Sequence, residues 1–228
     1  GAGCRNVFIG DESGSSSGTP SDNNAMSNVG IGPDTLKDLT TGDCNVAIGL
    51  AAGAQITTGS QNTFIHYFSG RYVTTGSWNL GIGRGAGAKL GAGSYNISLG
   101  PNSGFGNCAG GTSADNDASY NISIGGGSNC GLTDGDYNIA IGENAGQCVS
   151  TGCYNLFLGN LAGNTNTTGS NNVAIGYNVE LASATGSCQF KIGNGASWWI
   201  CGDSSFNIYD KDGNQLNGAS GGFEADDD

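Results

Sequence analysis

Basic residues are scarce in this chain, and so are the groups on which most enzyme and metal chemistry depends. Its 228 residues include 7 Lys and Arg against 19 Asp and Glu, which gives a net charge of −12. Such a surface repels nucleic acid and anionic membranes, so we expect no nucleic-acid partner. The single His and the absence of any Cys-x-x-Cys pair argue against a metal centre. We therefore expect no enzyme activity, no catalytic residue, no cofactor and no metal ligand.

Long hydrophobic runs and proline are also missing. No apolar segment approaches the ~18 residues that cross a membrane, so we expect no membrane insertion. Pro occurs only 3 times, whereas Gly occurs 44 times. Glycine this frequent without a three-residue period excludes collagen, and regularly spaced apolar residues argue against a disordered chain.

What the chain does have is one short motif that recurs almost from end to end: Asn, an apolar residue, a variable residue, an apolar residue and Gly. Most copies begin 17 residues apart, and two gaps are 22 and 25 residues long. The copies begin at Asn6, Asn28, Asn45, Asn62, Asn79, Asn96, Asn121, Asn138, Asn155, Asn172 and, in degraded form, Gln189. A fixed period of this size is typical of a solenoid. We predict an all-β parallel β-solenoid, or left-handed β-roll, of about eleven coils, roughly 50 Å long at the strand spacing.

The positions within one coil, numbered from its Asn, predict how the coil closes. Positions 2 and 4 are apolar, which is the period-2 pattern of a strand, and we interpret them as the inner face. Ile141, at position 4, is then expected to face the core. Position 12 is apolar again and predicts a second short strand on the far side of the coil. Gly at positions 5 and 15 predicts two corners, and His66, the one exception at position 5, is interpreted as a plain corner residue.

Stacked coils bring equal positions to ~4.8 Å from one another, so like residues should form ladders. We expect the Asn column to be hydrogen-bonded along the axis, amide to amide. Its members are Asn28, Asn45, Asn62, Asn79, Asn96, Asn121, Asn138, Asn155 and Asn172. Position 17 predicts an aromatic stack made of Trp78, Tyr95, Tyr120, Tyr137 and Tyr154.

The full pattern, seen in residues 45–61, runs from Asn-Val-Ala-Ile-Gly through Ala-Ala-Gly to Thr-Thr-Gly-Ser. It resembles the repeats of trimeric autotransporter adhesin heads. It is still more similar to repeat arrays in structural proteins of tailed phages, especially marine cyanophages, and of some large viruses. The resemblance covers roughly residues 1–193, and it departs from adhesin heads in coil length and in the eight Cys. It implies a virion tail fibre or an adhesin, and a trimer.

Three segments are predicted along the chain. Residues 1–193 form the repeat array, residues 194–218 a cap and β-hairpin, and residues 219–228 an acidic linker or tail. The chain opens in mid-coil, so we expect it to be a fragment of a longer protein. An apolar cluster is expected to cap the open coil. It consists of Phe190, Ile192, Trp198, Trp199 and Ile200.

Two insertions stand out from the frame. The 25-residue coil carries a surface loop whose residues Asp115, Asn116 and Asp117 are candidates for recognition, because loops on rigid scaffolds commonly bind partners. Residues 210–214 are similar to the start of a calcium loop but lack the bidentate Glu, so no metal site is predicted there.

The cysteines suggest two disulfides. Cys130 and Cys148 nearly overlie on adjacent coils, and Cys188 and Cys201 flank the predicted cap. Both pairs are candidates in an extracellular or virion setting, and reduced thiols are the alternative.

A single chain of this kind looks too thin to fold alone. Three apolar positions per coil do not offset the ~1–2 kcal/mol of backbone entropy lost per ordered residue. We therefore expect a homotrimer in which position 3 supplies the contacts. The contact candidates are Phe8, Ala47, Phe64, Ala140, Phe157 and Ala174.

These observations favour a structural, non-enzymatic segment of a virion fibre or appendage that presents surface loops to a host. A host-surface glycan or protein is the expected partner, and the expected location is the virion, the extracellular space or a cell surface. A bacterial adhesin head is the alternative. Ice binding by the paired Thr of positions 13 and 14 is a weaker hypothesis, because adjacent Thr point to opposite faces and do not form one flat array.

Overall fold

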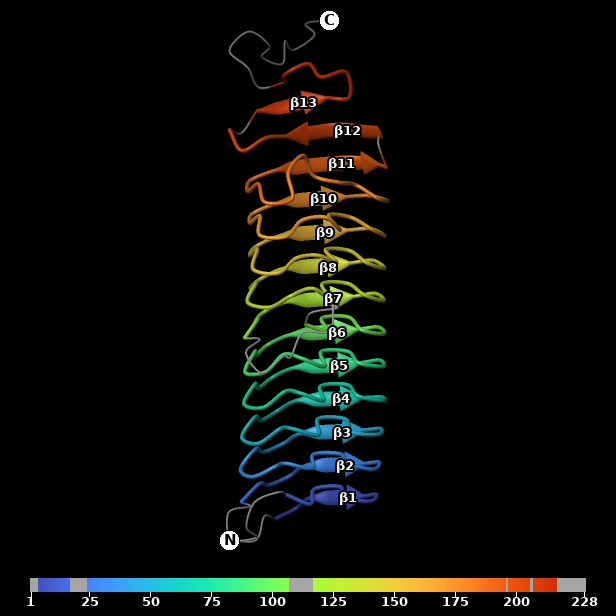
Figure 1. The fold of residues 1–228 in the computed structure, drawn as a ribbon, viewed down its shortest axis with the longest axis vertical. Helices are drawn as coiled ribbons and strands as arrows, with labels where there is room; N and C mark the ends of the chain where they lie inside the picture. The colour runs from blue at the N-terminus through green and yellow to red at the C-terminus, as the bar shows by residue number, and fades with distance from the viewer. Residues whose placement is uncertain (1–3, 17–23, 107–116, 196, 206, 217–228) are drawn as a thin grey trace, which may run out of the picture.

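The eleven copies of the motif form eleven parallel strands of one sheet. The protein is represented by a computed structural model that describes residues 4–16, 24–106, 117–195, 197–205 and 207–216. Figure 1 shows the strands stacked one above another along the shaft in chain order. The part of the chain described contains no helix. This confirms the all-β parallel solenoid.

All thirteen strands belong to a single sheet in which spatial order equals chain order. They are β1 (Val7–Ile9), β2 (Val29–Ile31), β3 (Val46–Ile48), β4 (Thr63–Ile65), β5 (Leu80–Ile82), β6 (Ile97–Leu99), β7 (Ile122–Ile124), β8 (Ile139–Ile141), β9 (Leu156–Leu158), β10 (Val173–Ile175), β11 (Phe190–Asn194), β12 (Ser197–Gly202) and β13 (Ile208–Asp210). Equal positions pair from coil to coil, as Ala47 pairs with Phe64. The solenoid completes about nine turns, slightly fewer than the predicted eleven.

The second strand predicted at position 12 does not form in the described coils. Leu39 and Ile56 are buried there as expected, but the segment runs as turns and bends. Positions 5, 7 and 9 have positive φ, as in Gly49 (φ 120°), Ala51 (52°) and Gly53 (57°), so the chain leading from the strand to position 12 consists of tight turns. Backbone hydrogen bonds still join the coils, for example from Thr40 N to Thr57 O (2.9 Å).

The inner and outer faces of the strands are the reverse of the prediction. Ala140, at position 3, is fully buried, whereas Ile139 and Ile141 at positions 2 and 4 are half-buried and point outward. Alternation shows which residues share a face but does not show which face lies inside. A coil of 17 residues encloses little volume, so the column of small residues faces the interior and the β-branched column faces away. Position 3 is Gly, Ala or Ser in most coils, which was the signal for this arrangement.

Three phenylalanines fill the interior where the small column leaves room. Phe64 and Phe157 are almost completely buried, and Phe8 packs against the core cluster that contains Phe64. Each ring lies over a glycine at position 9 with φ near 60°; a Cβ on Gly70 would come within 2.4 Å of the Phe64 ring. Position 9 must therefore be Gly wherever position 3 is Phe.

The asparagine ladder forms as predicted and is internal. Asn45 Oδ1 accepts hydrogen bonds from both the backbone N (3.0 Å) and Nδ2 (3.0 Å) of Asn62. Asn45 Nδ2 donates to Asn28 Oδ1 (3.1 Å) and to the carbonyl of Gly59 in its own coil (2.9 Å). Each amide thus links two coils and closes its own corner, so a buried polar group is fully satisfied.

The two glycine columns mark corners for different reasons. Position 5 needs positive φ, and His66 adopts φ 105° in that place, in agreement with a corner residue under strain. Position 15 needs close approach: a Cβ on Gly59 would lie 2.3 Å from the carbonyl oxygen of Gly76. Both corners were predicted.

The C-terminal end closes the stack by reversing direction. β12 runs antiparallel to β11, and β13 antiparallel to β12. A bridge between Tyr209 and Gln215 continues the predicted hairpin around the Asp-Gly turn. The predicted capping cluster is only partly formed, because Trp199 is 65% exposed on the outer side, while Phe190 and Trp198 border a cavity at the end of the coil.

Candidate interaction surface

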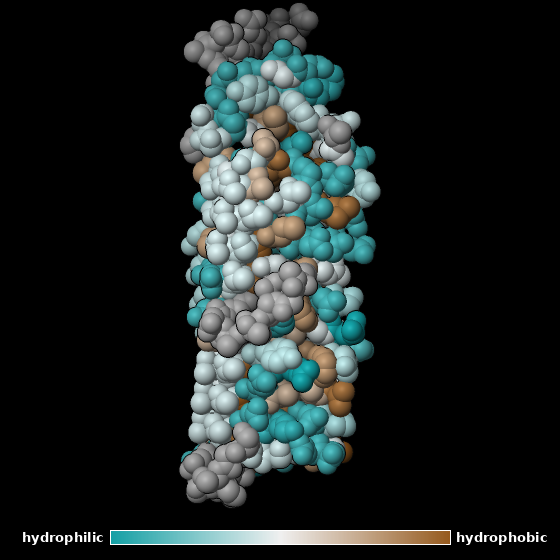
Figure 2. All heavy atoms as spheres, in the orientation of Figure 1, coloured by the Kyte–Doolittle hydropathy of each residue, from teal (hydrophilic) through white to brown (hydrophobic). Residues whose placement is uncertain are grey.

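The outward face of the sheet carries two aliphatic columns along the whole shaft. Positions 2 and 4 contribute Val, Ile or Leu at nearly every level. Several are strongly exposed for such residues, including Ile9 (59%), Ile82 (41%) and Leu158 (41%). On the side seen in Figure 2, hydrophobic residues recur along the length of the shaft and do not gather at one end. An apolar surface of this extent is unusual for a monomeric protein.

An aromatic ladder borders these columns. Position 17 immediately precedes the buried Asn, and its aromatic residues are 44–59% exposed on the outside of the coil. The rings of Tyr95, Tyr120, Tyr137 and Tyr154 stack at 4.8, 4.8 and 5.0 Å, and Trp78 follows at 6.2 Å from Tyr95. The predicted stack is therefore present. Desolvation by the neighbouring rings, with the charges of Tyr120 and Tyr154, raises the pKa of Tyr137.

The aromatic residues adopt a backbone conformation that bulky residues rarely take. All five have φ between 57° and 61°, the left-handed region. Other residues at position 17, such as Gln61 and Asn171, share it. The corner geometry of the coil imposes this conformation, and stacking of the rings offsets part of its cost.

The predicted trimer contacts do not lie on this surface. Phe64, Ala140 and Phe157 point into their own coil and are buried by the same chain, and so are Ala47 and Ala174. Phe8 is partly buried against the core. Position 3 therefore cannot mediate contact between chains, and this prediction was wrong. The outward aliphatic columns, which sequence reasoning assigned to the core, are the surface available for contact.

Neither predicted disulfide forms. Cys148, Cys188 and Cys201 are free thiols. Cys130 is almost fully buried, and Cys148 is an exposed free thiol, so the two are not bonded to each other. Cys188 occupies the outward position 17, whereas Cys201 lies opposite Lys191 of the inward position 3. Burial raises the pKa of the Cys201 thiol.

Cys153 has a separate structural role. It belongs to a column at position 16 in which a Ser or Asp side chain accepts a hydrogen bond from the backbone of the preceding coil. Ser77 Oγ accepts from Ser60 N at 3.0 Å, and Cys153 Sγ takes the same place for Asp136 N at 3.3 Å. This second ladder was not predicted, although the recurrent Ser before the aromatic residue was visible in the sequence.

Only one of the three recognition-loop candidates lies among the described residues. Asp115 and Asn116 lie outside the described residues, and Asp117 is exposed at the end of the loop. Ser119, two residues later, rejoins the position-16 ladder by accepting a hydrogen bond from Ser94 N (3.0 Å).

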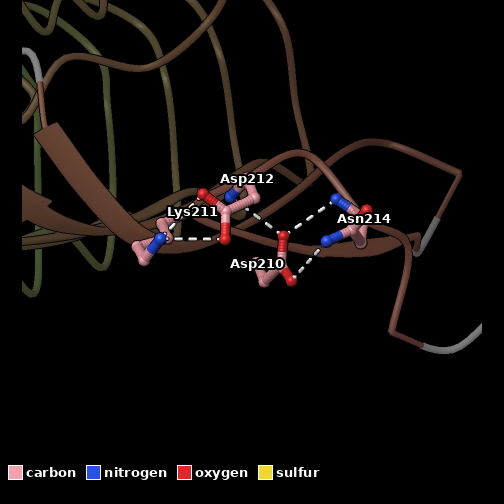
Figure 3. Close-up of polar contacts among 4 residues, drawn as sticks. All are labelled: Asp210, Lys211, Asp212 and Asn214. Atoms are coloured by element: carbon pink, nitrogen blue, oxygen red, sulfur yellow. Dashed lines mark hydrogen bonds and ion pairs between the residues drawn. The ribbon is translucent and has the colours of Figure 1, made fainter.

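In residues 210–214, which resemble the start of a calcium loop, the Asp210 carboxylate is hydrogen-bonded within the loop. Asp210 Oδ1 accepts hydrogen bonds from the backbone N of Asp212 (2.9 Å) and of Asn214 (2.8 Å), and its Oδ2 accepts from Asn214 Nδ2 (2.9 Å) (Figure 3). The Asn214 side chain first, then the backbone groups, lower the pKa of the Asp210 carboxyl. Asp203 makes the same arrangement with Asn207. The carboxylates serve as turn acceptors.

Two other kinds of site are absent from the described ranges. No group of three His, Cys, Asp or Glu side chains is placed to hold a metal ion there. The same residues include no helix long and apolar enough to cross a membrane. Comparisons of the chain with models of known protein families, with curated proteins and with solved structures find no match.

Proposed function

We propose that this chain is a structural, non-enzymatic segment of a virion fibre or appendage, and that it assembles as a homotrimer through the outer face of its sheet. The observation that carries the proposal is the pair of exposed aliphatic columns at positions 2 and 4. They form one continuous apolar strip, whereas exposed hydrophobic residues on monomers are scattered.

The strip is large enough to hold chains together. Eleven parallel strands at ~4.8 Å give a length of roughly 50 Å, and the five residues from position 17 to position 4 give a width of roughly 16 Å. The resulting area is about 800 Å² per chain, which a trimer divides between two neighbours, so three chains together bury about 2,400 Å². Burial of this strip supplies the apolar area that a single thin coil lacks.

A three-fold arrangement suits this narrow strip. In each layer a chain offers two aliphatic side chains, so three chains in register bring six to a common axis and close the assembly symmetrically. The aromatic ladder then lies at the rim, where one edge of each ring stays in water. The resemblance of the repeat to trimeric fibres and heads supports the same arrangement.

The architecture suits a stiff spacer that presents loops. Every coil is tied to the next by backbone bonds, the Asn ladder and the position-16 ladder, so length is set by the number of repeats. Insertions such as the loop ending at Asp117 and Ser119 leave this frame unchanged. Such loops are where we place host recognition, with a surface glycan or protein as partner.

Light scattering of the purified chain tests the assembly. The chain has a mass of 22.7 kDa, and the proposal expects a folded particle of about three times that mass. Ile141→Asp should lower the mass to one chain because it places three carboxylates at the axis. Thr58→Asp, at the exposed position 14, is the matched control and should remain trimeric. A wild-type particle with the mass of one or two chains would overturn the trimer.

A further inference from the structure

Charge is distributed very unevenly along this acidic chain. No Asp or Glu occurs between Asp43 and Asp115, although the chain has 19 of them. The same stretch contains Arg71, Arg84 and Lys89, three of only 7 basic residues. Two consecutive coils, which begin at Asn62 and Asn79, therefore form a basic band on a shaft whose net charge is −12. A local reversal of this kind indicates a surface for an anionic partner.

One coil inside this band departs from the repeat. Where other coils have Gly and small residues, residues 66–72 read His-Tyr-Phe-Ser-Gly-Arg-Tyr. The rings of Tyr67 and Phe68 stack at 3.8 Å. The Arg71 guanidinium lies 4.1 Å from the Phe68 centroid and 5.0 Å from that of Tyr72. Such cation–π contacts hold the guanidinium in one place.

The polar groups of Arg71 are unused. In the described part of the chain its side chain makes no hydrogen bond and no ion pair, although it is half-buried. A guanidinium presents five N–H donors in a planar fork that matches a carboxylate in two parallel bonds. Because the aromatic contacts already hold the guanidinium in place, a bound carboxylate would meet a pre-positioned counterion.

Arg71 forms one end of a groove of about 240 Å³. Its floor consists of the small side chains of Ala51 and Ala54, and Gln55 lies along it. These residues belong to the coil below Arg71, and the small residues there leave the hollow between bulkier neighbours.

The opposite end of the groove comes from the next coil down. Lys37 is there, and its Nζ is bonded to Asp34 Oδ1 (3.1 Å) and paired with Glu12. Asp38 completes the lining with a second carboxylate. Because Lys37 is neutralised by the chain itself, Arg71 is the one cation of the groove available to a ligand. The far end thus offers carboxylate acceptors for hydroxyl donors.

We infer that this groove binds an acidic saccharide residue, with the sugar carboxylate on Arg71 and the sugar hydroxyls donating to Asp34 and Asp38 or bonding to Gln55. The alanine floor accepts the apolar C–H face of the ring. A nucleic acid fits less well, because a phosphate chain brings no donors for the two Asp carboxylates and meets their negative charge. The inference deepens the proposed recognition role of the shaft and rests on it.

The position of the groove is compatible with the proposed assembly. Its residues come from positions 7, 10 and 11 of three successive coils, and none belongs to a strand. The outer strand face can therefore be buried between chains while the groove remains open to solvent. Three copies in a trimer would also give multivalent binding to a glycan-covered surface.

Saturation-transfer NMR and titration calorimetry with defined probes test the inference. The probes are 3′-sialyllactose, trigalacturonate, neutral lactose, a sulfated heparin tetrasaccharide and a dT oligonucleotide. At least one of the two carboxylated sugars should bind, and lactose should not. Arg71→Gln should weaken binding roughly tenfold or more, the cost of losing one charge-assisted pair. Arg84→Gln removes the same charge one coil away, outside the groove, and should change affinity less than about twofold.

A second variant tests the groove itself: Ala54→Leu fills the floor and should abolish binding while leaving Arg71 and the net charge intact. Failure of both carboxylated sugars to bind would overturn the inference. It would also be overturned by equal losses in the two Arg variants, or by binding confined to the sulfated probe or the oligonucleotide. Light scattering on the same samples separates the two proposals, because a single-chain particle that still binds would refute only the trimer.

Discussion

The inward placement of position 3 can be tested by comparing the stability of two variants, Phe157→Ala at position 3 and Leu158→Ala at position 4. Phe157 is fully buried, whereas its neighbour Leu158 is 41% exposed. Truncating a buried Phe costs about 3–5 kcal/mol, and the amount depends on how far the surroundings collapse into the cavity.

The surroundings of Phe157 cannot collapse easily. Its register partners are Ala140 and Ala174, and the glycines Gly146 and Gly163 lie beside the ring, where a Cβ would come within 2.8 and 2.3 Å of it. Backbone and methyl groups held by the coil-to-coil hydrogen bonds do not move into a void. We therefore expect a loss near 5 kcal/mol, the upper end of that range.

Leu158→Ala removes atoms that are already partly in water, so the loss within one chain should be about 1 kcal/mol. Chemical denaturation followed by circular dichroism at two protein concentrations measures both variants. The part of the stability that depends on concentration reports assembly, and the remainder reports the coil itself. An equal loss for the two variants in that remainder, or a larger loss for Leu158→Ala, would refute the inward placement of position 3.

Three further outcomes follow from the described contacts. His66→Gly should stabilise the chain by about 1 kcal/mol in a thermal melt, because φ 105° is strained for any residue except Gly; a lower melting temperature would count against corner strain. Cys153→Ser should stabilise by a few tenths to about 1 kcal/mol, since a hydroxyl replaces the weak sulfur acceptor for Asp136 N at 3.3 Å, and an unchanged denaturation midpoint would deny the ladder a role. The pKa of Asp203 and of Asp210 is lowered, first by the Asn side-chain bonds, so their turns are stabilised above the ordinary carboxyl pKa of 3.8 and lose that support as the pH falls below it. The protection factors of amides in residues 203–205 and 207–214, which correct for the slower intrinsic exchange at acid pH, should fall before those of the Asn ladder do, and a simultaneous fall would contradict the assignment.

Much of the fold follows from repetition alone. Parallel strands pair equal positions, so a 17-residue period is sufficient to predict the sheet register, the ladder of Asn45 and Asn62, and the stack that includes Tyr95 and Tyr120. The glycine corners were predictable as well, because positive φ and close backbone approach both exclude a Cβ. These features depend on the backbone and on the identity of one residue per coil.

The face of the strand that lies inside was not determined by periodicity. Positions 2 and 4 alternate with position 3 in either arrangement, and only the volume enclosed by a finished coil excludes Ile139 and Ile141 from it. The second strand is absent for a related reason. Positive φ at positions 5, 7 and 9 turns the chain tightly, and so short a coil leaves no length for a second extended segment.

The candidate sites required the assembled stack. The disulfide predictions used the separation of coils, but bonding also depends on the direction of each Cβ, and Cys148 is a free, exposed thiol whereas Cys130 is buried. The groove at Arg71 consists of residues from three coils that the sequence separates by 17 positions each, and it exists because Ala51 and Ala54 are small between larger neighbours. The sequence by itself therefore determined the repeat, the register and the ladders. The tertiary structure alone decided the inner face, the apolar strip and the groove, because each depends on how side-chain volumes fill or leave space in three dimensions.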